Sequence, residues 1–424
     1  MNSPAAGGAP GRLRRDLGLF DAVVIGLGAM IGAGVFTAMA PAARAAGGGL
    51  VAGLVVAAVV AYCNATSSAR LAAHYPESGG TYVYGRERLG EFWGHLAGWA
   101  FVVGKSASCA AMALTVGAYA WPEHAHVVAV IAVVVLTGVD YAGVQRSAWL
   151  TRAVVAVVLT TLAALVAAAL SAAPPPGEWS WGATGTGWLG GVPEAAGLLF
   201  FAFAGYARIA TLGEEVRDPR RTIPRAIGLA LGVTLVVYGA VTVAVLAVLG
   251  PERLGETDAP LAVAAEAAGA DWLVPVVRVA AVAAALGSLL ALILGVSRTV
   301  LAMARDRHLP GVLAAVHPRH AVPHRAALAV GVVVAVLAAT ADLRAAIGFS
   351  SFGVLVYYAV ANASAWTLPR HEGGPFRPIP VIGLLGCLLL AVALPPSSVV
   401  TGAIVVASGA AVYGIRRLAT RRRD

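Results

Sequence analysis

Long apolar runs recur from one end of the chain to the other, and no other feature constrains the fold as strongly. Most are about 17 to 25 residues long, the length at which a helix crosses the hydrocarbon core of a bilayer. The composition agrees, because 59% of the 424 residues are hydrophobic and 12% are charged, whereas soluble domains have about 25% charged residues. The sequence therefore predicts an all-α polytopic membrane protein with about twelve transmembrane helices, at residues 17–44, 50–73, 92–119, 127–144, 151–172, 194–215, 226–249, 272–304, 326–340, 347–368, 380–394 and 399–415.

Basic residues are distributed unevenly between the two sets of loops that these spans define. With the N-terminus in the cytoplasm, 22 of the 30 basic residues lie in cytoplasmic segments, and only Arg44, Arg253 and Arg344 lie outside. Because positive charge collects on cytoplasmic loops, we expect a multi-pass protein of the cell membrane with both termini in the cytoplasm. The net charge of +9 then belongs to that face, where anionic lipid explains it without nucleic acid.

Glycine clusters interrupt two of the predicted spans. The segment "GLGAMIGAGVF" at residues 26–36 lies within the first span, and "FAFAGYA" at residues 201–207 lies within the sixth. Because the second cluster lies five spans after the first, and an odd offset reverses direction, the second unit is inverted relative to the first, which is typical of inverted-repeat transporters. Close packing through a GxxxG spacing is an alternative for the first cluster. A dinucleotide-binding turn is excluded, because the cluster lies inside an apolar helix and residues 51–56 contain no acid.

Four blocks of sequence carry a family resemblance: "GLGAMIGAGVF", "YPESGGTYVYGRERLG", "FFAFAGYARIATLGEEVRDPRRTIPRAI" and "GVSRTVLAMARDRHLP". Together they resemble the amino acid-polyamine-organocation superfamily, in particular its bacterial amino acid permeases. The resemblance implies a LeuT-like fold of five plus five helices in an inverted repeat, with helices 1 and 6 broken and two helices appended. It also implies secondary transport of amino acids or related amines, with no cofactor. The expected domains are an N-terminal tail at 1–16, repeats at 17–172 and 173–368, two further helices at 369–418 and a C-terminal tail at 419–424.

Interrupted helices can hold an amino acid, because each end of the zwitterion needs a partner when it leaves water. Where the first helix restarts, amides without helical acceptors lie at the positive end of a helix dipole and suit a carboxylate. These amides belong to Ile31, Gly32, Ala33 and Gly34. The ammonium is expected at the carbonyls near Phe200, Phe203 and Ala204, where Gly205 leaves the backbone accessible. The family pattern also implies an aromatic lid over the substrate, which we assign to Phe203; a lipid-facing ring is the alternative.

Two basic residues lie at membrane depth. Lys105 is the only lysine and lies near the middle of the third span, and Arg208 follows the break in the sixth. Because charge in the bilayer is costly, both are expected to face the interior or a cavity. A buried amine that gains and loses a proton would let Lys105 couple transport to a proton gradient; a structural hydrogen bond to backbone carbonyls is the alternative. For Arg208 we expect a gating or structural contact with Glu214 or Glu215, and direct contact with substrate is the alternative.

Selectivity and gating follow from these and other charges. Two fixed positive charges without an acid at the same depth repel a cationic side chain, so neutral amino acids are favoured over cationic amino acids and polyamines. At the cytoplasmic side, Arg15 before the first helix and Asp306 after the eighth are candidates for a gate; simple topology signals are the alternative. Ser288 offers a hydroxyl for a sodium site, although serines within helices more often bond their own backbone.

The remaining classes of function find less support in the residues. We expect no enzyme, because no paired carboxylates, Ser/His pair or metal cluster is assembled within the spans. The three cysteines, Cys63, Cys109 and Cys387, lie in predicted helices without metal-ligand spacing. The acidic loop at 251–271 is interpreted as a solvated surface. We expect an amino acid and the lipid bilayer as partners and no obligate protein partner; transport is expected to be coupled to protons or to proceed by exchange. A non-transporting amino acid sensor and a channel are the alternatives.

Overall fold

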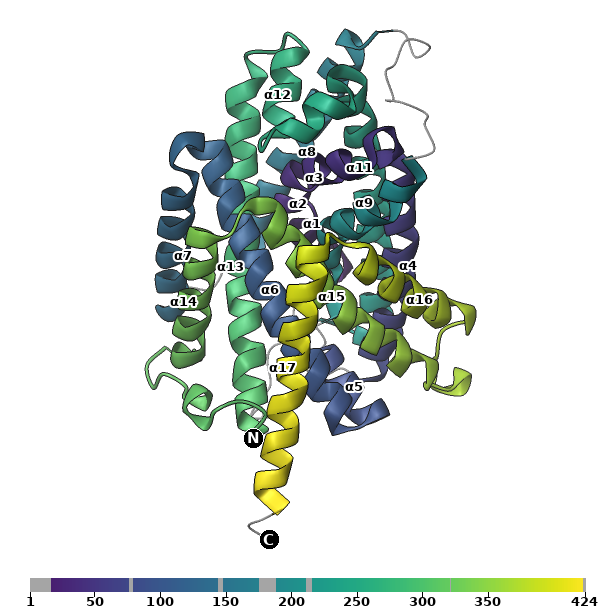
Figure 1. Cartoon of the computed structure of the whole chain (residues 1–424), viewed down its shortest axis with the longest axis vertical. Helices are drawn as coiled ribbons and strands as arrows, with labels where there is room; N and C mark the ends of the chain where they lie inside the picture. Colours follow the sequence, from purple (N-terminus) through teal and green to yellow (C-terminus); the bar gives the residue numbers. More distant parts are fainter. Residues whose placement is uncertain are drawn as a thin grey trace, which may run out of the picture.

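The computed structural model describes residues 17–75, 79–143, 148–174, 188–210, 216–320 and 322–421. The regular structure in these ranges is helical, and long helices stand side by side (Figure 1). The first half contains α1 (Leu19–Met30), α2 (Ala33–Thr37), α3 (Met39–Ala46), α4 (Leu50–His74), α5 (Thr81–Leu89), α6 (Glu91–Ala120), α7 (Ala125–Tyr141) and α8 (Ala148–Ala172).

The second half of the chain begins with another interrupted helix. It contains α9 (Trp188–Phe203), the 3-10 turn η4 (Ala204–Tyr206), α10 (Ala207–Ala210), α11 (Pro219–Glu256), α12 (Pro260–Ala267), α13 (Leu273–Arg305), α14 (His324–Thr340), α15 (Leu343–Trp366), α16 (Pro378–Ala393) and α17 (Pro396–Arg421). Short 3-10 turns connect some of these helices, among them η2 (Pro122–His124), η5 (Gly311–Ala314) and η6 (Arg370–Glu372).

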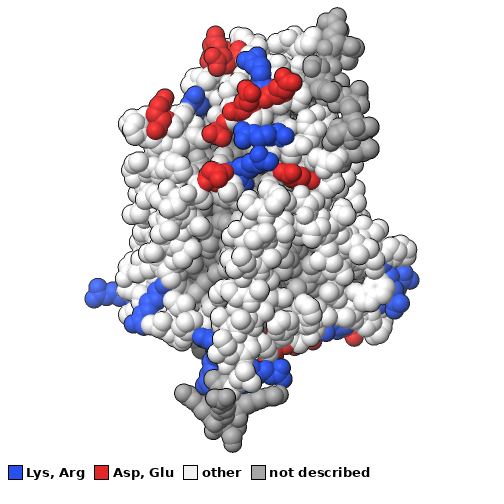
Figure 2. Space-filling model, viewed as in Figure 1, with Lys and Arg blue, Asp and Glu red and all other residues white. Residues whose placement is uncertain are grey.

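The described residues include ten segments that are long and apolar enough to span a membrane. Two shorter apolar helices, α14 and α16, lie where the sequence places its ninth and eleventh spans. In Figure 2 the charged side chains gather near the two ends of the visible face, and the band between them is uncharged. The chain is therefore an all-α polytopic membrane protein, as predicted, while the count of twelve crossings stays a prediction.

Two ends of the bundle can be distinguished from the contacts of the chain. Leu17 pairs with Val216 immediately before α11, and α11 then runs toward α12. The helix α13 returns from α12, and the carbonyl of Arg307 at its far end accepts a hydrogen bond from Arg416 of α17. Thus α1 begins and α17 ends away from α12. We call the two ends of the bundle the α12 end and the α5 end, after the short helices α12 and α5, which lie in the upper and the lower part of Figure 1.

The two predicted interruptions are present, and they differ in form. The first is a true break, since α1 ends at Met30 and α2 begins at Ala33. The second is a 3-10 turn, η4, between α9 and α10. α1 runs away from the α5 end, whereas α9 and α10 run toward it, because Val216 lies there. The two interrupted helices are therefore antiparallel.

The long helix α6 forms the centre of the packing. It contacts α5, α7, α13, α14, α15 and α17, so most of its residues are buried. Small residues allow close approach: a Cβ added to Gly104 would lie 3.1 Å from the Cα of Gly353 in α15. This packing carries Lys105 of α6 into the interior.

Candidate functional site

The two interruptions meet, and glycine makes the contact possible. A Cβ on Gly205 would lie 2.3 Å from the carbonyl oxygen of Ala29 and 2.6 Å from the amide nitrogen of Met30. A Cβ on Gly34 would lie 2.6 Å from the Cα of Ala202. Because these neighbours are backbone atoms or lie directly on the backbone, a larger residue requires a shift of the chain. The two helices therefore approach each other backbone to backbone at their interruptions.

The break in the first helix is buried and held by a neighbouring helix. Ile31 and Gly32 leave helical geometry, with ψ of 47° and −135° respectively, and the residues from Ile31 to Gly34 are all buried. The hydroxyl of Ser288 in α13 donates to the carbonyl of Gly28 at 3.1 Å. The serine thus bonds the interrupted helix and not its own backbone, contrary to the usual pattern within helices. It satisfies a carbonyl that the break leaves without a helical donor.

The interruption of the sixth span centres on one carbonyl group. The oxygen of Ala204 accepts a hydrogen bond from Nζ of Lys105 at 3.3 Å and another from the hydroxyl of Tyr358 at 3.5 Å. Lys105 is 5% exposed. The lysine therefore faces the interior, as expected, and contacts the predicted site residue Ala204. The contact is a hydrogen bond to a backbone carbonyl, which was the alternative to a coupling role. Its role in coupling is not decided by this contact and stays a prediction.

A tyrosine bridges the two interruptions. The hydroxyl of Tyr238 in α11 lies 2.5 Å from the carbonyl oxygen of Met30 and 3.0 Å from that of Ala202. Because a phenol has one proton, it donates fully to one of these carbonyls at a time. The ring of Phe203 packs on this tyrosine with centroids 5.1 Å apart. Phe203 is fully buried, so it is not the lipid-facing ring that the alternative required.

Only some of the predicted contacts of charged residues lie within the described ranges. Arg208 lies in α10, is partly exposed and has an interaction partner. The expected contacts of Arg208 with Glu214 or Glu215, and the contact of Arg15 with Asp306, involve residues outside the described ranges. These gate contacts stay predictions.

Asp306 is bound by α5, which the sequence did not indicate. Its Oδ2 accepts hydrogen bonds from the hydroxyl of Tyr82 at 2.6 Å and from Nη1 of Arg86 at 2.8 Å. Burial, together with the hydrogen bond to the carboxylate of Asp306, raises the pKa of Tyr82. The phenol therefore stays protonated and donates. The contact ties α5 to the end of α13.

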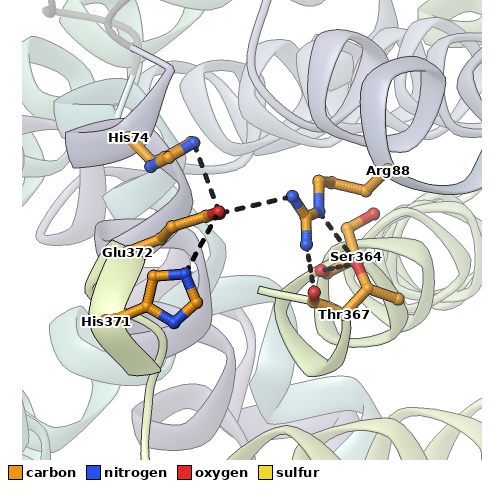
Figure 3. A network of polar contacts seen from close by, with 6 residues as sticks. All are labelled: His74, Arg88, Ser364, Thr367, His371 and Glu372. Carbon is orange, nitrogen blue, oxygen red and sulfur yellow. Dashed lines mark hydrogen bonds and ion pairs between the residues drawn. The ribbon is translucent and has the colours of Figure 1, made fainter. Parts of the chain in front are cut away.

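A second polar network ties α5 to the end of α15 (Figure 3). Nη1 of Arg88 lies 3.6 Å from the carboxylate of Glu372, and Nε donates to the hydroxyl of Thr367 at 3.0 Å. His74 at the end of α4 lies 3.8 Å from the same carboxylate. α5 is thus connected by polar side chains to α4, α13 and α15, all at the α5 end.

Tyr238 and Tyr358 are the residues at the interruptions that the sequence interpretation missed. Both are at most 2% exposed and lie within apolar helices. A hydroxyl at membrane depth requires a partner, so a tyrosine in the middle of an apolar run is a signal in itself. What the sequence does not contain is the identity of the partner carbonyls, because they lie on distant helices.

Known amino acid transporters match nearly the whole chain. The family described as amino acid permease matches residues 17–415. An uncharacterized transporter of Mycobacterium tuberculosis is 70% identical over 97% of this chain and 94% of its own length. A branched-chain amino acid permease, BcaP, of Bacillus subtilis is 27% identical over 95% of this chain and 92% of its own. The human cationic amino acid transporter 4 is 29% identical over 86% of this chain and 61% of its own.

Proposed function

Because this chain belongs to the amino acid permease family, we propose that it carries amino acids with neutral side chains across the cell membrane by alternating access. Transport is coupled to protons or proceeds by exchange. Both termini and the α5 end face the cytoplasm, in keeping with the excess of arginine in the segments on that side. The α12 end faces outward.

The observation that carries this proposal is the backbone contact between the two interruptions. Antiparallel broken helices that meet in the membrane are the arrangement in which transporters bind substrate at the midplane. In this proposal the amides from Ile31 to Gly34 bind the carboxylate, and the carbonyls near Phe200, Phe203 and Ala204 bind the ammonium. Phe203 serves as the lid, and Gly205 keeps the two backbones close. The repeats at 17–172 and 173–368 provide one broken helix each.

The preference for neutral side chains follows from Lys105. Its ammonium lies within hydrogen-bonding distance of the Ala204 carbonyl, so the site already contains one positive charge. The α-ammonium of any amino acid is balanced by its own carboxylate, whereas a cationic side chain adds a net positive charge, and repulsion between like charges is poorly screened in a buried site. The name of BcaP, a branched-chain amino acid permease, is in keeping with this preference. Transport of cationic amino acids is the second candidate, favoured by relatives that are named cationic amino acid transporters.

Proton coupling is assigned to Lys105, which would release its proton as the site changes its exposure between the two sides. We expect Lys105→Met to abolish uptake driven by a proton gradient while exchange of internal for external amino acid continues. The measurement is uptake into proteoliposomes under each condition. Full retention of proton-driven uptake by this variant would remove the lysine from the coupling mechanism and leave the transporter proposal intact.

Uptake into proteoliposomes also tests the function as a whole. We expect radiolabelled neutral amino acids, with L-leucine as the first candidate, to accumulate under a proton gradient or against internal counter-substrate. Arginine and polyamines serve as the cationic comparison, and a sodium gradient tests the other common coupling ion. Equilibration without accumulation or exchange would identify a channel, and binding without flux would identify a sensor. Either result contradicts the proposed function.

A further inference from the structure

A polar pocket of about 420 Å³ lies at the α12 end, apart from the interruptions themselves. Distant segments form it: α2 and α3, the end of α6, the start of α7, the loop that follows α11 and the start of α15. Figure 2 shows red and blue side chains gathered together at this end of the visible face. Its charged lining comprises Arg44, Glu256, Asp258, Asp342 and Arg344.

The pocket offers charges of both signs that are not neutralised by one another. Arg44 donates from Nε to the carbonyl of Gly255 at 2.9 Å, so its guanidinium is fixed by a neutral group. The carboxylates of Glu256 and Asp258 have no ion pair with any residue in the described parts of the chain. Arg344, by contrast, is paired with Glu194 at 3.0 Å. Asp342 has no ion pair in the described residues either, but its Oδ1 accepts a hydrogen bond from the amide of Ala345 at 2.8 Å. The guanidinium of Arg44 and the carboxylates of Glu256 and Asp258 are therefore the charged groups offered to a ligand.

The pocket is also close to the break in the first helix. Its wall includes Thr37, which lies in α2 three residues beyond Gly34. The Thr37 hydroxyl lies 3.5 Å from that of Thr115 in α6. The same short helix therefore has the proposed carboxylate site at one end and the pocket wall at the other.

We propose that this pocket is a second binding site for an α-amino acid, which occupies it before moving to the interruptions. The guanidinium of Arg44 binds the carboxylate, and Asp258 with Glu256 binds the ammonium. Charges of both signs in one pocket lining match a zwitterion, and the volume is within the range of small-molecule sites. This inference rests on the proposed function, since it takes the same substrate class and places it on the path from the α12 end.

The number of amino acids bound per chain tests the proposal. Equilibrium dialysis of the full chain in nanodiscs with radiolabelled neutral amino acids, L-leucine first, is expected to give two bound per chain. The double variant Glu256→Gln with Asp258→Asn is expected to bind one and to raise the KM for uptake about tenfold, which corresponds to about 1.4 kcal/mol. The matched control is Glu252→Gln with Asp271→Asn, which neutralises the same loop outside the pocket lining and should still bind two.

Three results would overturn the proposal. The first is that the unaltered chain takes up amino acid normally but binds only one amino acid per chain. The second is that the double variant still binds two amino acids and has an unchanged KM. The third is that the control variant loses as much binding as the double variant, which would indicate a general effect of the loop charge. If the unaltered chain neither binds nor takes up any amino acid, the proposed function fails together with this inference, so the two failures are distinguishable.

Discussion

Gly205 has almost no space around its Cα, because the backbone of the other interrupted helix lies directly against it. Several glycines in the chain are different. Gly228 in α11, for example, would place a Cβ in open space, with no atom outside its own stretch of helix within 4 Å. The two positions carry the same residue for different reasons. At Gly205 the small size is required by a contact between distant segments, while at Gly228 nothing in the structure requires it.

We expect Gly205→Ala to lower the free energy of unfolding by about 1–3 kcal/mol, the usual cost of overpacking, and to abolish most uptake. Gly228→Ala should leave both unchanged or raise the stability slightly, because alanine is the better helix former. Thermal unfolding in detergent and uptake into proteoliposomes measure the two effects. If Gly205→Ala behaved as Gly228→Ala does, the close approach of the interruptions would not be needed for transport.

Among the elements, the nine-residue helix α5 has polar side-chain contacts with several other parts of the chain. Asp306 holds it to α13, and Glu372 and Thr367 hold it to the segment after α15. Each link joins side chains that are partly exposed to solvent, so each is worth little as a source of stability. Their arrangement suits a latch at the α5 end, which must form and break as that end closes and opens.

We expect Asp306→Asn to change the unfolding free energy by less than about 1 kcal/mol while making the α5 end easier to open. The asparagine keeps an acceptor for Tyr82 and loses the charge that holds Arg86. The expected result is a several-fold lower KM for substrate offered from the α5 side of proteoliposomes. The exposed pair of Asp218 and Arg221 provides the control, and Asp218→Asn should leave KM unchanged. An unaltered KM in Asp306→Asn would argue against the latch.

For the whole molecule, the orientation in the membrane is a prediction from arginine positions alone. Single cysteines can test it, because Cys63, Cys109 and Cys387 are all buried. We expect Glu123→Cys, in the exposed turn η2 at the α12 end, to react with a membrane-impermeant maleimide in intact cells. Glu87→Cys in α5 should react only after the membrane is permeabilised. The opposite pattern would invert the topology.

Local signals in the sequence predicted the features that depend on local backbone. Runs of apolar residues located the helices, and the glycines of "GAMIGAG" and "FAFAGYA" located both interruptions. Contacts between distant segments were not predictable in this way. The acidic loop at 251–271 was interpreted as solvated surface, and its carboxylates are exposed, but two of them also line a pocket with Arg44, more than 200 residues earlier. Nothing in the loop itself identifies that partner.

The hydrogen bond from Lys105 to the carbonyl of Ala204 has a consequence for the order of events during transport. A substrate ammonium that uses this oxygen meets a cation already seated there. Two ammonium groups cannot share one acceptor in a buried site without strong repulsion. In the proposed binding mode, the lysine ammonium occupies this acceptor before the substrate arrives, so substrate binding would require that the ammonium move away or lose its proton. Binding of the substrate ammonium and loss of the lysine ammonium from this carbonyl would then be one exchange of a cation for another.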